Sequence, residues 1–208
     1  MAQVKKGDKL KKDLIQKLLI LTQLEYSTQN NVFSQLEGRS GLIYKQWPKL
    51  YKNPEYKKWM RDPNEATTRF ILVIDNVVVT HAAVFERKLQ ANGLKIAGLG
   101  GVVVKADQRG KNYGHFIVEA ATNWIKANSD VRNIDIALLT CHPKYELFYK
   151  RHGWKKLANS EKIRYGDSID TSQPRTDGEI TMIIYLSTGA IEKRHVLEAT
   201  SPYFGRSF

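Results

Sequence analysis

The sequence predicts an α/β (α+β) domain built around a central mixed sheet with helices packed on its faces. Three apolar segments, 69–75, 77–89 and 94–105, follow one another across short turn-prone connections, which favours antiparallel hairpins. The pattern after them changes to alternating strand and helix segments. A meander that leads into such a unit is typical of a mixed, mostly antiparallel sheet.

The alternating region predicts two helices and three strands. Apolar residues with a period of 3.6 indicate a helix over 115–128, a strand follows over 134–140, and a second helix is expected over about 143–152. A further strand is expected to begin at Trp154, and the apolar run 179–186 supplies the last one.

The two ends of the chain have weaker patterns. Leu14, Leu18 and Leu21 at helical spacing predict an amphipathic helix near the N-terminus. From there to about Glu65, aromatic residues lie among three prolines and indicate short helices and loops. The last stretch, 187–208, is either an ordered appendage or a tail that binds a partner.

Length and composition favour one domain. The chain has 208 residues and 42% of them are hydrophobic, which is enough for one core and short for two. We therefore expect a single domain over 1–208, with its core at about 69–186, an N-terminal helix over 1–20 and a C-terminal tail over 187–208.

Several classes of protein do not fit the sequence. No stretch reaches the roughly 18 apolar residues that cross a bilayer, and the N-terminus lacks the apolar block of a secretion signal. We expect a cytoplasmic protein with no membrane partner. The single Cys141 excludes an internal disulfide, and no ligand spacing typical of a metal site occurs, so no metal is expected.

The charge of the chain favours anionic partners. Thirty-three Lys and Arg residues against 21 Asp and Glu residues give a formal net charge of +12, which suits nucleic acid, a membrane surface or a phosphorylated small molecule. Aromatic residues such as Tyr51 and Tyr56 would suit single-stranded nucleic acid. The lysines are scattered, however, and no RNP1 or C2H2 pattern is present, so nucleic acid is the weaker alternative.

The segment DQRGKNYG, 107–114, connects a predicted strand to the helix over 115–128. A helix that opens directly after a strand directs unpaired backbone N–H groups and the positive end of its dipole at one place, which binds phosphate. Gly110 and Gly114 let a ligand approach the backbone closely, and Arg109 and Lys111 add full charges. The alternative is an ordinary basic surface turn. Neither the P-loop pattern nor the three spaced glycines of a Rossmann site occurs here.

This segment resembles the acyl-CoA-binding motif of the GCN5-related N-acetyltransferases (GNAT), in which [QR]-x-x-G-x-[GA] follows a strand and opens a helix. Asn112 departs from the family, which usually has glycine there, although asparagine tolerates left-handed backbone. The matching residues are Arg109, Gly110, Lys111, Asn112, Tyr113 and Gly114.

A second signature of that family, an apolar–tyrosine pair followed after three residues by glycine and an aromatic residue, is matched by Phe148, Tyr149, Gly153 and Trp154. The two signatures occur in order with one helix and one strand between them, which is more specific than either alone. The resemblance covers about 69–158 and implies a GNAT-like sheet with helices on both faces. It also implies acetyl-CoA as the cofactor.

The resemblance assigns roles to further residues. The backbone of Val102, Val103 and Val104 is expected to pair with the pantetheine arm and the thioester carbonyl of acetyl-CoA, and the segment 109–114 to hold its pyrophosphate. His142 stands where the family often has an asparagine that contacts the pantetheine arm.

Tyr149 is the expected general acid, since a phenol of pKa about 10 can protonate a departing thiolate whose conjugate acid has a pKa of about 8.5. The alternative is a core tyrosine on a helix. A nucleophilic pair of Cys141 and His142 is not expected, because neighbours on a strand point in opposite directions.

His81 and Glu86, on one predicted strand, are the candidates for substrate contact and for deprotonating the amine, directly or through water. The alternative is an ordinary strand face with polar residues.

A narrower resemblance, to the aminoglycoside 2′-N-acetyltransferase branch, rests on the segments HAAVFERKL, GVVVKADQRGK and PRTDGEITMIIYL. That branch also lacks glycine at the Asn112 position. It carries an acidic residue near the start of the cofactor-binding strand, where this chain has Gly100 and Gly101.

The sequence therefore predicts an acetyl-CoA-dependent N-acetyltransferase that acts on a small-molecule amine by direct transfer in a ternary complex. The alternatives are a non-catalytic CoA-binding module, a nucleic-acid-binding module and an acetyltransferase with a protein or peptide acceptor. The oligomeric state stays open, with a homodimer as one arrangement.

Overall fold

The fold is described from a computed structural model, in which residues 18–48, 66–88, 94–158, 164–165, 173–174 and 178–199 are described. The chain folds as two compact units. Unit 1 comprises Met1–Ala83 and Gly101–Val118, and unit 2 comprises Val84–Gly100 and Glu119–Phe208. Strand β3, Val77–Lys88, strand β4, Lys95–Val104, and helix α6, Tyr113–Arg132, each have residues in both units.

A seven-stranded sheet runs in the order β1-β2-β3-β4-β5-β9-β6. Strand β4, Lys95–Val104, pairs in parallel with β5, Ile136–Cys141, whereas β5 pairs antiparallel with β9, Ile180–Tyr185. The predicted mixed, mostly antiparallel sheet is therefore confirmed. A separate two-stranded sheet pairs β7, Arg164–Tyr165, with β8, Gln173–Pro174.

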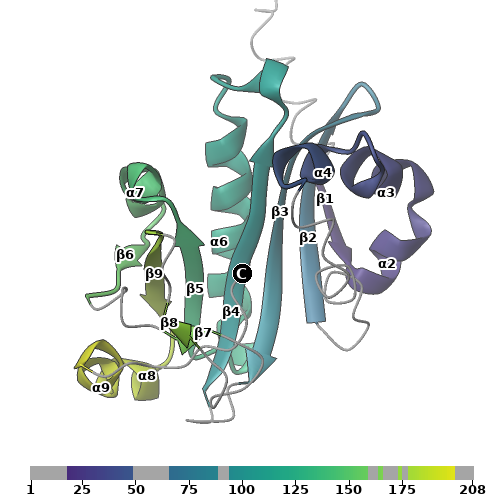
Figure 1. The fold of residues 1–208 in the computed structure, drawn as a ribbon. Helices are drawn as coiled ribbons and strands as arrows, with labels where there is room; N and C mark the ends of the chain where they lie inside the picture. Colours follow the sequence, from purple (N-terminus) through teal and green to yellow (C-terminus); the bar gives the residue numbers. More distant parts are fainter. Residues whose placement is uncertain are drawn as a thin grey trace, which may run out of the picture. The chain divides into compact units, whose positions relative to one another are not determined.

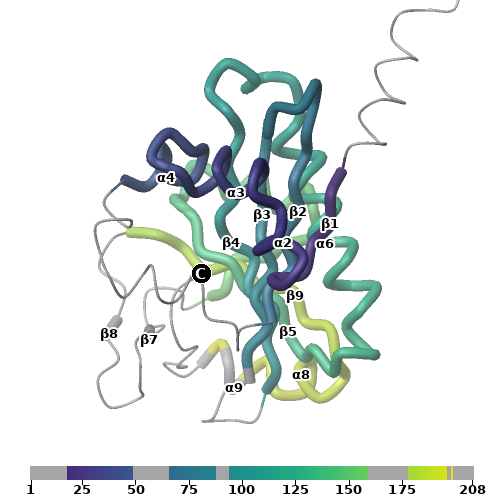
Figure 2. The backbone as a smooth tube through the Cα atoms, turned by 90° about the vertical axis from the view of Figure 1, so that its right-hand side faces the viewer, coloured from purple at the N-terminus to yellow at the C-terminus, as the bar shows by residue number. Residues whose placement is uncertain are grey.

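Unit 1 holds the meander. Strands β2, Ala66–Ile74, and β3, Val77–Lys88, are neighbours in the sheet (Figure 2). Asp75 and Asn76 join them with φ values of 49° and 61°, the left-handed pair that a two-residue hairpin turn requires and that Asp and Asn tolerate best. The turn predicted at this place is confirmed.

Three short helices complete unit 1, drawn in purple to blue in Figure 1: α2, Gln23–Thr28, α3, Asn30–Glu37, and α4, Leu42–Gln46. Their apolar residues join those of the strands in one core. Its buried members are Tyr26, Val32, Leu36, Ile43, Ile71, Val78 and Val103. The short helices predicted between the N-terminus and Glu65 are confirmed as far as the structure describes that segment.

Strand β1, Leu18–Thr22, corrects the N-terminal prediction. The leucine spacing predicts a helix there, but these residues pair antiparallel with β2 from Leu18 opposite Leu72 to Thr22 opposite Thr68. Leu19 and Leu21 face the core of unit 1 with the alternation of a strand. Residues 1–17 of the predicted helix lie outside the described residues.

Helix α6, Tyr113–Arg132, is the longest helix of the described chain and matches the predicted one, extended by two residues at its start and by four at its end. Unit 2 adds the 3-10 helix η3, Pro143–Tyr145, helix α7, Glu146–Lys150, and strand β6, Lys155–Lys156. The predicted second helix is thus a 3-10 turn that continues into α7. The tail forms two short helices, α8, Thr188–Glu192, and α9, Arg194–Ala199.

Hydrogen bonds of two side chains, Asp135 and Trp154, join elements of unit 2. Asp135 accepts hydrogen bonds from the backbone N–H of Lys95 (2.9 Å) and from the hydroxyl of Ser187 (2.7 Å), so it ties the starts of β4 and β5 to the cap of α8. Trp154 is 1% exposed and donates its indole N–H to Thr122 of α6 at 3.1 Å. None of the described helices is long and apolar enough to cross a membrane.

Candidate functional site

The loop predicted to bind phosphate lies in unit 1 between β4 and α6. Its 3-10 turn η2, Ala106–Gln108, is followed by Gly110 at φ 80° and Asn112 at φ 62°. A Cβ on Gly110 would meet no atom within 4 Å, so the loop leaves open space there. Asn112 has the left-handed conformation that asparagine tolerates, and its carbonyl accepts the N–H of Phe116 in the first turn of α6.

Two basic side chains of this loop are exposed. The Nε of Arg109 donates to the carbonyl of Val104 at 3.3 Å and its terminal nitrogen to Gln46 of α4 at 3.2 Å. Lys111 donates to Gln108 at 2.9 Å. The guanidinium, the ammonium and the start of a 20-residue helix thus gather at one exposed turn. These groups fit a polyphosphate such as the pyrophosphate of CoA.

The backbone expected to bind the pantetheine arm, Val102 to Val104, forms the end of β4. The parallel ladder of β4 with β5 comprises three pairs, Ile96–Gly98 with Ile136–Leu138, and does not include these valines. Val103 is 3% exposed in the core of unit 1, and Val102 and Val104 are half-buried. The residue before them, Gly101, has φ 61° in the left-handed region.

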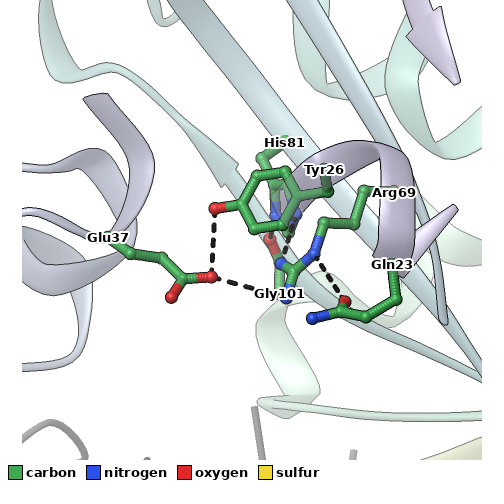
Figure 3. Close-up of polar contacts among 6 residues, drawn as sticks. All are labelled: Gln23, Tyr26, Glu37, Arg69, His81 and Gly101. Carbon is green, nitrogen blue, oxygen red and sulfur yellow. Dashed lines mark hydrogen bonds and ion pairs between the residues drawn. The ribbon is translucent and has the colours of Figure 1, made fainter. Parts of the chain in front are cut away.

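The carbonyl of Gly101 is bound by a side chain. Nδ1 of His81 on β3 lies 2.8 Å from this oxygen, and Nε2 of His81 lies 3.3 Å from a terminal nitrogen of Arg69 on β2 (Figure 3). A carbonyl only accepts and a guanidinium only donates, so Nδ1 carries the proton and Nε2 presents its lone pair. The two neighbours fix the tautomer of His81.

Arg69 is itself enclosed. It is 0% exposed, lies over the ring of Tyr26 at 4.2 Å and pairs with the carboxylate of Glu37 at 3.4 Å. The hydroxyl of Tyr26 donates to the same carboxylate oxygen at 3.0 Å, and Arg69 also donates to Gln23 (Figure 3). The buried cation is thus paired with an anion and stacked on an aromatic ring, as a buried charge requires.

This geometry does not support the predicted role of His81 in deprotonating the substrate amine. His81 is 1% exposed, and both of its ring nitrogens are bonded. Burial, together with the positive charge of Arg69, lowers the pKa of His81 to about 3. The imidazole is therefore neutral at physiological pH, and the lone pair that would take a proton faces a guanidinium.

Tyr149, the predicted general acid, lies on α7 in unit 2. Its side chain is 8% exposed, and its ring contacts Phe148 edge to face with the centroids 4.9 Å apart. Within the described part of the chain its hydroxyl has no hydrogen-bond partner. Burial raises the pKa of Tyr149 above its ordinary value, so the phenol keeps its proton throughout the physiological range.

The two residues before η3 have different environments. Cys141 is 6% exposed with its sulfur 3.9 Å from that of Met182, and burial raises the pKa of its thiol to about 11. A protonated, buried thiol is a poor nucleophile. His142 is exposed, and its Nδ1 accepts the backbone N–H of Lys144 at 3.2 Å, which caps η3. Its contact with a cofactor stays a prediction.

Glu86, the other predicted substrate contact, lies in unit 2 and is 8% exposed. Its carboxylate pairs with Arg132 of α6 and, at 3.0 Å, with Lys95 of β4. Arg132 also stacks on Trp124 at 4.8 Å. Two cations already hold this carboxylate, so its geometry is that of a structural ion pair and does not support a role as a base.

Sequence reasoning missed Arg69 and the hydrogen bond to Gly101. A signal for Arg69 was present, since an arginine that opens the apolar segment RFILVID needs a partner if the strand is buried. No local pattern indicates which of Gly98, Gly100 and Gly101 adopts a left-handed conformation. Among the described residues no three His, Cys, Asp or Glu side chains lie together as a metal site.

The family model described as "Acetyltransferase (GNAT) family" matches residues 33–154, more than half of the chain. The chain belongs to the GNAT acetyltransferase family. No curated protein matches this GNAT chain in sequence.

Solved structures agree on the fold. Escherichia coli YhbS, a GNAT family N-acetyltransferase in complex with CoA, has a TM-score of 0.55 and 14% identity, over 91% of this chain and 89% of its own. Escherichia coli ElaA has a TM-score of 0.52 and 14% identity, over 80% and 97%. The catalytic domain of the Tetrahymena GCN5 histone acetyltransferase, with coenzyme A, has a TM-score of 0.51 and 16% identity, over 82% and 93%.

The expected GNAT fold is confirmed, and the expected cofactor, acetyl-CoA, agrees with the family. The narrower resemblance to the aminoglycoside 2′-N-acetyltransferases is not confirmed by these comparisons.

Proposed function

We propose that this GNAT chain transfers the acetyl group of acetyl-CoA to the amine of a small molecule by direct attack within a ternary complex. Acetyl-CoA supplies the activated acyl group. The exposed turn formed by Arg109, Lys111 and the start of α6 would hold its pyrophosphate, and the backbone of Val102 and Val104 its pantetheine arm.

The observation that carries the proposed mechanism is the state of Tyr149. A protonated phenol with no partner among the described residues can donate a proton, and loss of CoA as a leaving group needs a donor for the thiolate sulfur. Tyr149 therefore has the role of general acid. The amine must attack in its neutral form, and the described residues already considered for its deprotonation, His81 and Glu86, are both engaged.

Direct transfer is supported by Cys141. Its thiol is buried and its pKa is raised to about 11, so less than about one thiol in a thousand is ionised at pH 7 to 8. A covalent acetyl-cysteine intermediate therefore has no activated nucleophile at this position. Attack by the amine on the thioester carbonyl forms the carbon–nitrogen bond and breaks the carbon–sulfur bond, and the thiolate leaves with a proton from the phenol. The nitrogen loses one proton to water as the amide forms, and the phenolate regains one from water, so the phenol is restored.

The net charge of the chain bears on which amine is acetylated. A formal net charge of +12 disfavours a polycationic acceptor, which argues against an aminoglycoside unless acidic side chains cluster locally. A protein or peptide acceptor is the second candidate, favoured by the likeness in fold to the Tetrahymena histone acetyltransferase. The aromatics invoked for nucleic-acid binding, Tyr51 and Tyr56, lie outside the described residues.

The test is CoA release from acetyl-CoA across a panel of polyamines, amino acids, aminoglycosides and peptides, with the products identified by mass. Turnover on one class is expected, with kcat about 10²-fold or more lower in Tyr149→Phe and little change in the KM for acetyl-CoA. Tyr145→Phe is the matched control, since Tyr145 is 49% exposed on the preceding turn.

Acetyl-CoA binding without turnover on any acceptor would instead indicate a CoA-binding module. Equal kcat values for Tyr149→Phe and Tyr145→Phe would remove Tyr149 from the reaction while leaving the family assignment intact.

A further inference from the structure

Strand β4 turns alternate peptide groups toward β3 at its C-terminal end. The carbonyl of Gly101 accepts from His81, the carbonyl of Val103 accepts from the hydroxyl of Thr80 at 2.7 Å, and the N–H of Lys105 donates to β3 at 2.9 Å. Thr80 and His81 are neighbours on β3, so their side chains leave it on opposite faces. The end of β4 is therefore held from both faces of the sheet.

The hydrogen bonds to the carbonyls of Gly101 and Val103 fix the direction of the amides that follow them. The carbonyl of one residue and the N–H of the next point in opposite directions across a trans peptide, and no described peptide bond is cis. With the Gly101 carbonyl on His81, the N–H of Val102 points away from His81. The N–H of Val104 points away from Thr80 for the same reason.

The bond from His81 also supports an uncommon backbone conformation. Gly101 is left-handed at φ 61°, and a Cβ at this position would lie 3.1 Å from Cε1 of the His81 ring. The imidazole thus packs against the α-carbon of Gly101 while Nδ1 holds its carbonyl. A side chain at position 101 would crowd the His81 ring and would also be strained at this φ.

Arg69 determines which nitrogen of the His81 ring carries the proton. Its guanidinium donates to Nε2, which leaves Nδ1 as the only protonated nitrogen of a neutral ring. The burial of the ring and the positive charge of Arg69 oppose a second proton, in agreement with a pKa of about 3. The Nδ1–H of His81 therefore stays available to the Gly101 carbonyl, even at a pH near 6.5, where an ordinary histidine titrates.

We infer that His81, held in its Nδ1–H tautomer by Arg69, is a positioning residue that fixes the Gly101–Val102 peptide so that the Val102 N–H faces the acyl-CoA thioester. This inference rests on the proposed function. His81 then does not deprotonate the substrate amine but orients a backbone N–H donor. Such a donor stabilises the reaction only when it already points at the oxygen on which charge develops.

The experiment compares two substitutions of His81. His81→Leu removes the donor, whereas His81→Asn places an amide N–H near the position of Nδ1. We expect kcat/KM for acetyl-CoA about tenfold to hundredfold lower in His81→Leu, mainly through kcat, and at least partial recovery in His81→Asn.

Tyr26→Phe is the matched control for stability. It removes the 3.0 Å bond to Glu37 at the other end of the same buried network and leaves His81 and β4 untouched. It is expected to lower the melting temperature without lowering kcat/KM. Equal losses of kcat/KM in Tyr26→Phe and His81→Leu would overturn the inference, because both would then report loss of structure alone.

A second measurement does not depend on catalysis. The ¹⁵N chemical shifts of the His81 ring in the full chain distinguish its tautomers, and the Nδ1–H form is expected from pH 5 to 8. The Val102 amide signal should shift in His81→Leu and return toward the wild-type position in His81→Asn. An Nε2–H ring, or a Val102 signal unchanged in His81→Leu, would overturn the inference.

The two measurements separate the possible failures. Wild-type protein without acetyl-CoA turnover, but with the expected tautomer and Val102 shifts, would count against the proposed function and support the positioning of the peptide. Wild-type turnover that His81→Leu leaves intact would count against the inference alone.

Discussion

His81 shows how one buried side chain couples stability to pH. Its pKa falls from an ordinary value of 6.5 to about 3 in the folded chain because it is buried and faces Arg69. Above pH 6.5 the ring is neutral in both states, so the neutral contacts contribute fully. Between about pH 6.5 and pH 3 the unfolded chain binds a proton that the folded chain does not, so stability decreases as the pH falls.

We predict that the free energy of unfolding of the wild-type chain decreases by about 2 kcal/mol more than that of His81→Asn between pH 7 and pH 5. The other groups that face His81 or its partner, namely Arg69, Glu37 and Tyr26, are present in both proteins, so their titration cancels in the difference. Urea unfolding at the two pH values measures it. Parallel pH profiles would show that folding does not lower the pKa of His81.

Residue roles were predictable from the sequence only where the local pattern determines them. The resemblance places Asn112 where the family usually has glycine, and asparagine tolerates the left-handed backbone that its φ of 62° shows. His81 was predicted on the strand where it lies, but its contacts with Arg69 on β2 and with Gly101 on β4 were not predicted. Contacts across a sheet depend on strand register, which alternation within one segment does not fix.

At the scale of elements, Asp135 joins three segments at the start of β5. Its carboxylate accepts from Lys95 and Ser187, while its backbone carbonyl accepts the N–H groups of Leu186 and Ser187. The carboxylate thus replaces a ladder bond at the edge of the parallel pair and orients the hydroxyl that caps α8, since Ser187 also accepts the N–H of Ala190.

We predict that Asp135→Ala lowers the free energy of unfolding by about 2 to 3 kcal/mol, because two hydrogen bonds to a charged acceptor are lost and a backbone N–H loses its partner. Asp130→Ala is the control for the change in charge, since Asp130 is exposed on α6, and it should change stability by less than about 0.5 kcal/mol. Urea unfolding monitors both. Equal losses of stability in the two variants would mean that the change in charge, and not the loss of the Asp135 hydrogen bonds, lowers the free energy of unfolding.

The segment at β1 shows where element prediction fails. Leu14, Leu18 and Leu21 have helical spacing, yet Leu18 to Thr22 pair with β2 as a strand. Leu19 and Leu21 fit the core of unit 1 equally well with a period of two. A short apolar run satisfies both periods, and the neighbouring strand decides between them. The longer patterns, β3, β4 and α6, have no such ambiguity and were predicted with small errors at their ends.

At the scale of the whole molecule, the net charge of +12 acts on both proposed substrates. A field of one sign raises the local concentration of an anionic donor such as acetyl-CoA and lowers that of a cationic acceptor. Salt screens both effects, because the Debye length falls from about 10 Å at 0.1 M to about 3 Å at 1 M. The two KM values should therefore respond to salt in opposite directions if the acceptor is a cation.

We predict that the KM for acetyl-CoA rises several-fold between about 0.05 M and 0.5 M sodium chloride, with little change in kcat. A cationic acceptor should show a falling KM over the same range, and a neutral one an almost constant KM. Initial rates at saturating levels of the other substrate measure each dependence. A KM for acetyl-CoA that does not respond to salt would show that local contacts alone bind the donor.

The fold class was predictable because it needs only the order and type of the elements, and a meander followed by strand, helix and strand allows few arrangements. The family followed from two short motifs at the right separation, and the match to residues 33–154 confirms it. The acceptor did not follow, because the two motifs assign residues to the cofactor and to the proton donor and none to the acceptor.

The position of the single cysteine has a practical consequence for enzymology. Cys141 is 6% exposed, and its thiol has a pKa of about 11. An aromatic disulfide reagent that counts free sulfhydryls should therefore see almost none on the folded protein. Every equivalent of colour that appears during turnover then reports released coenzyme, and a sudden additional equivalent would signal that the protein has opened around β5.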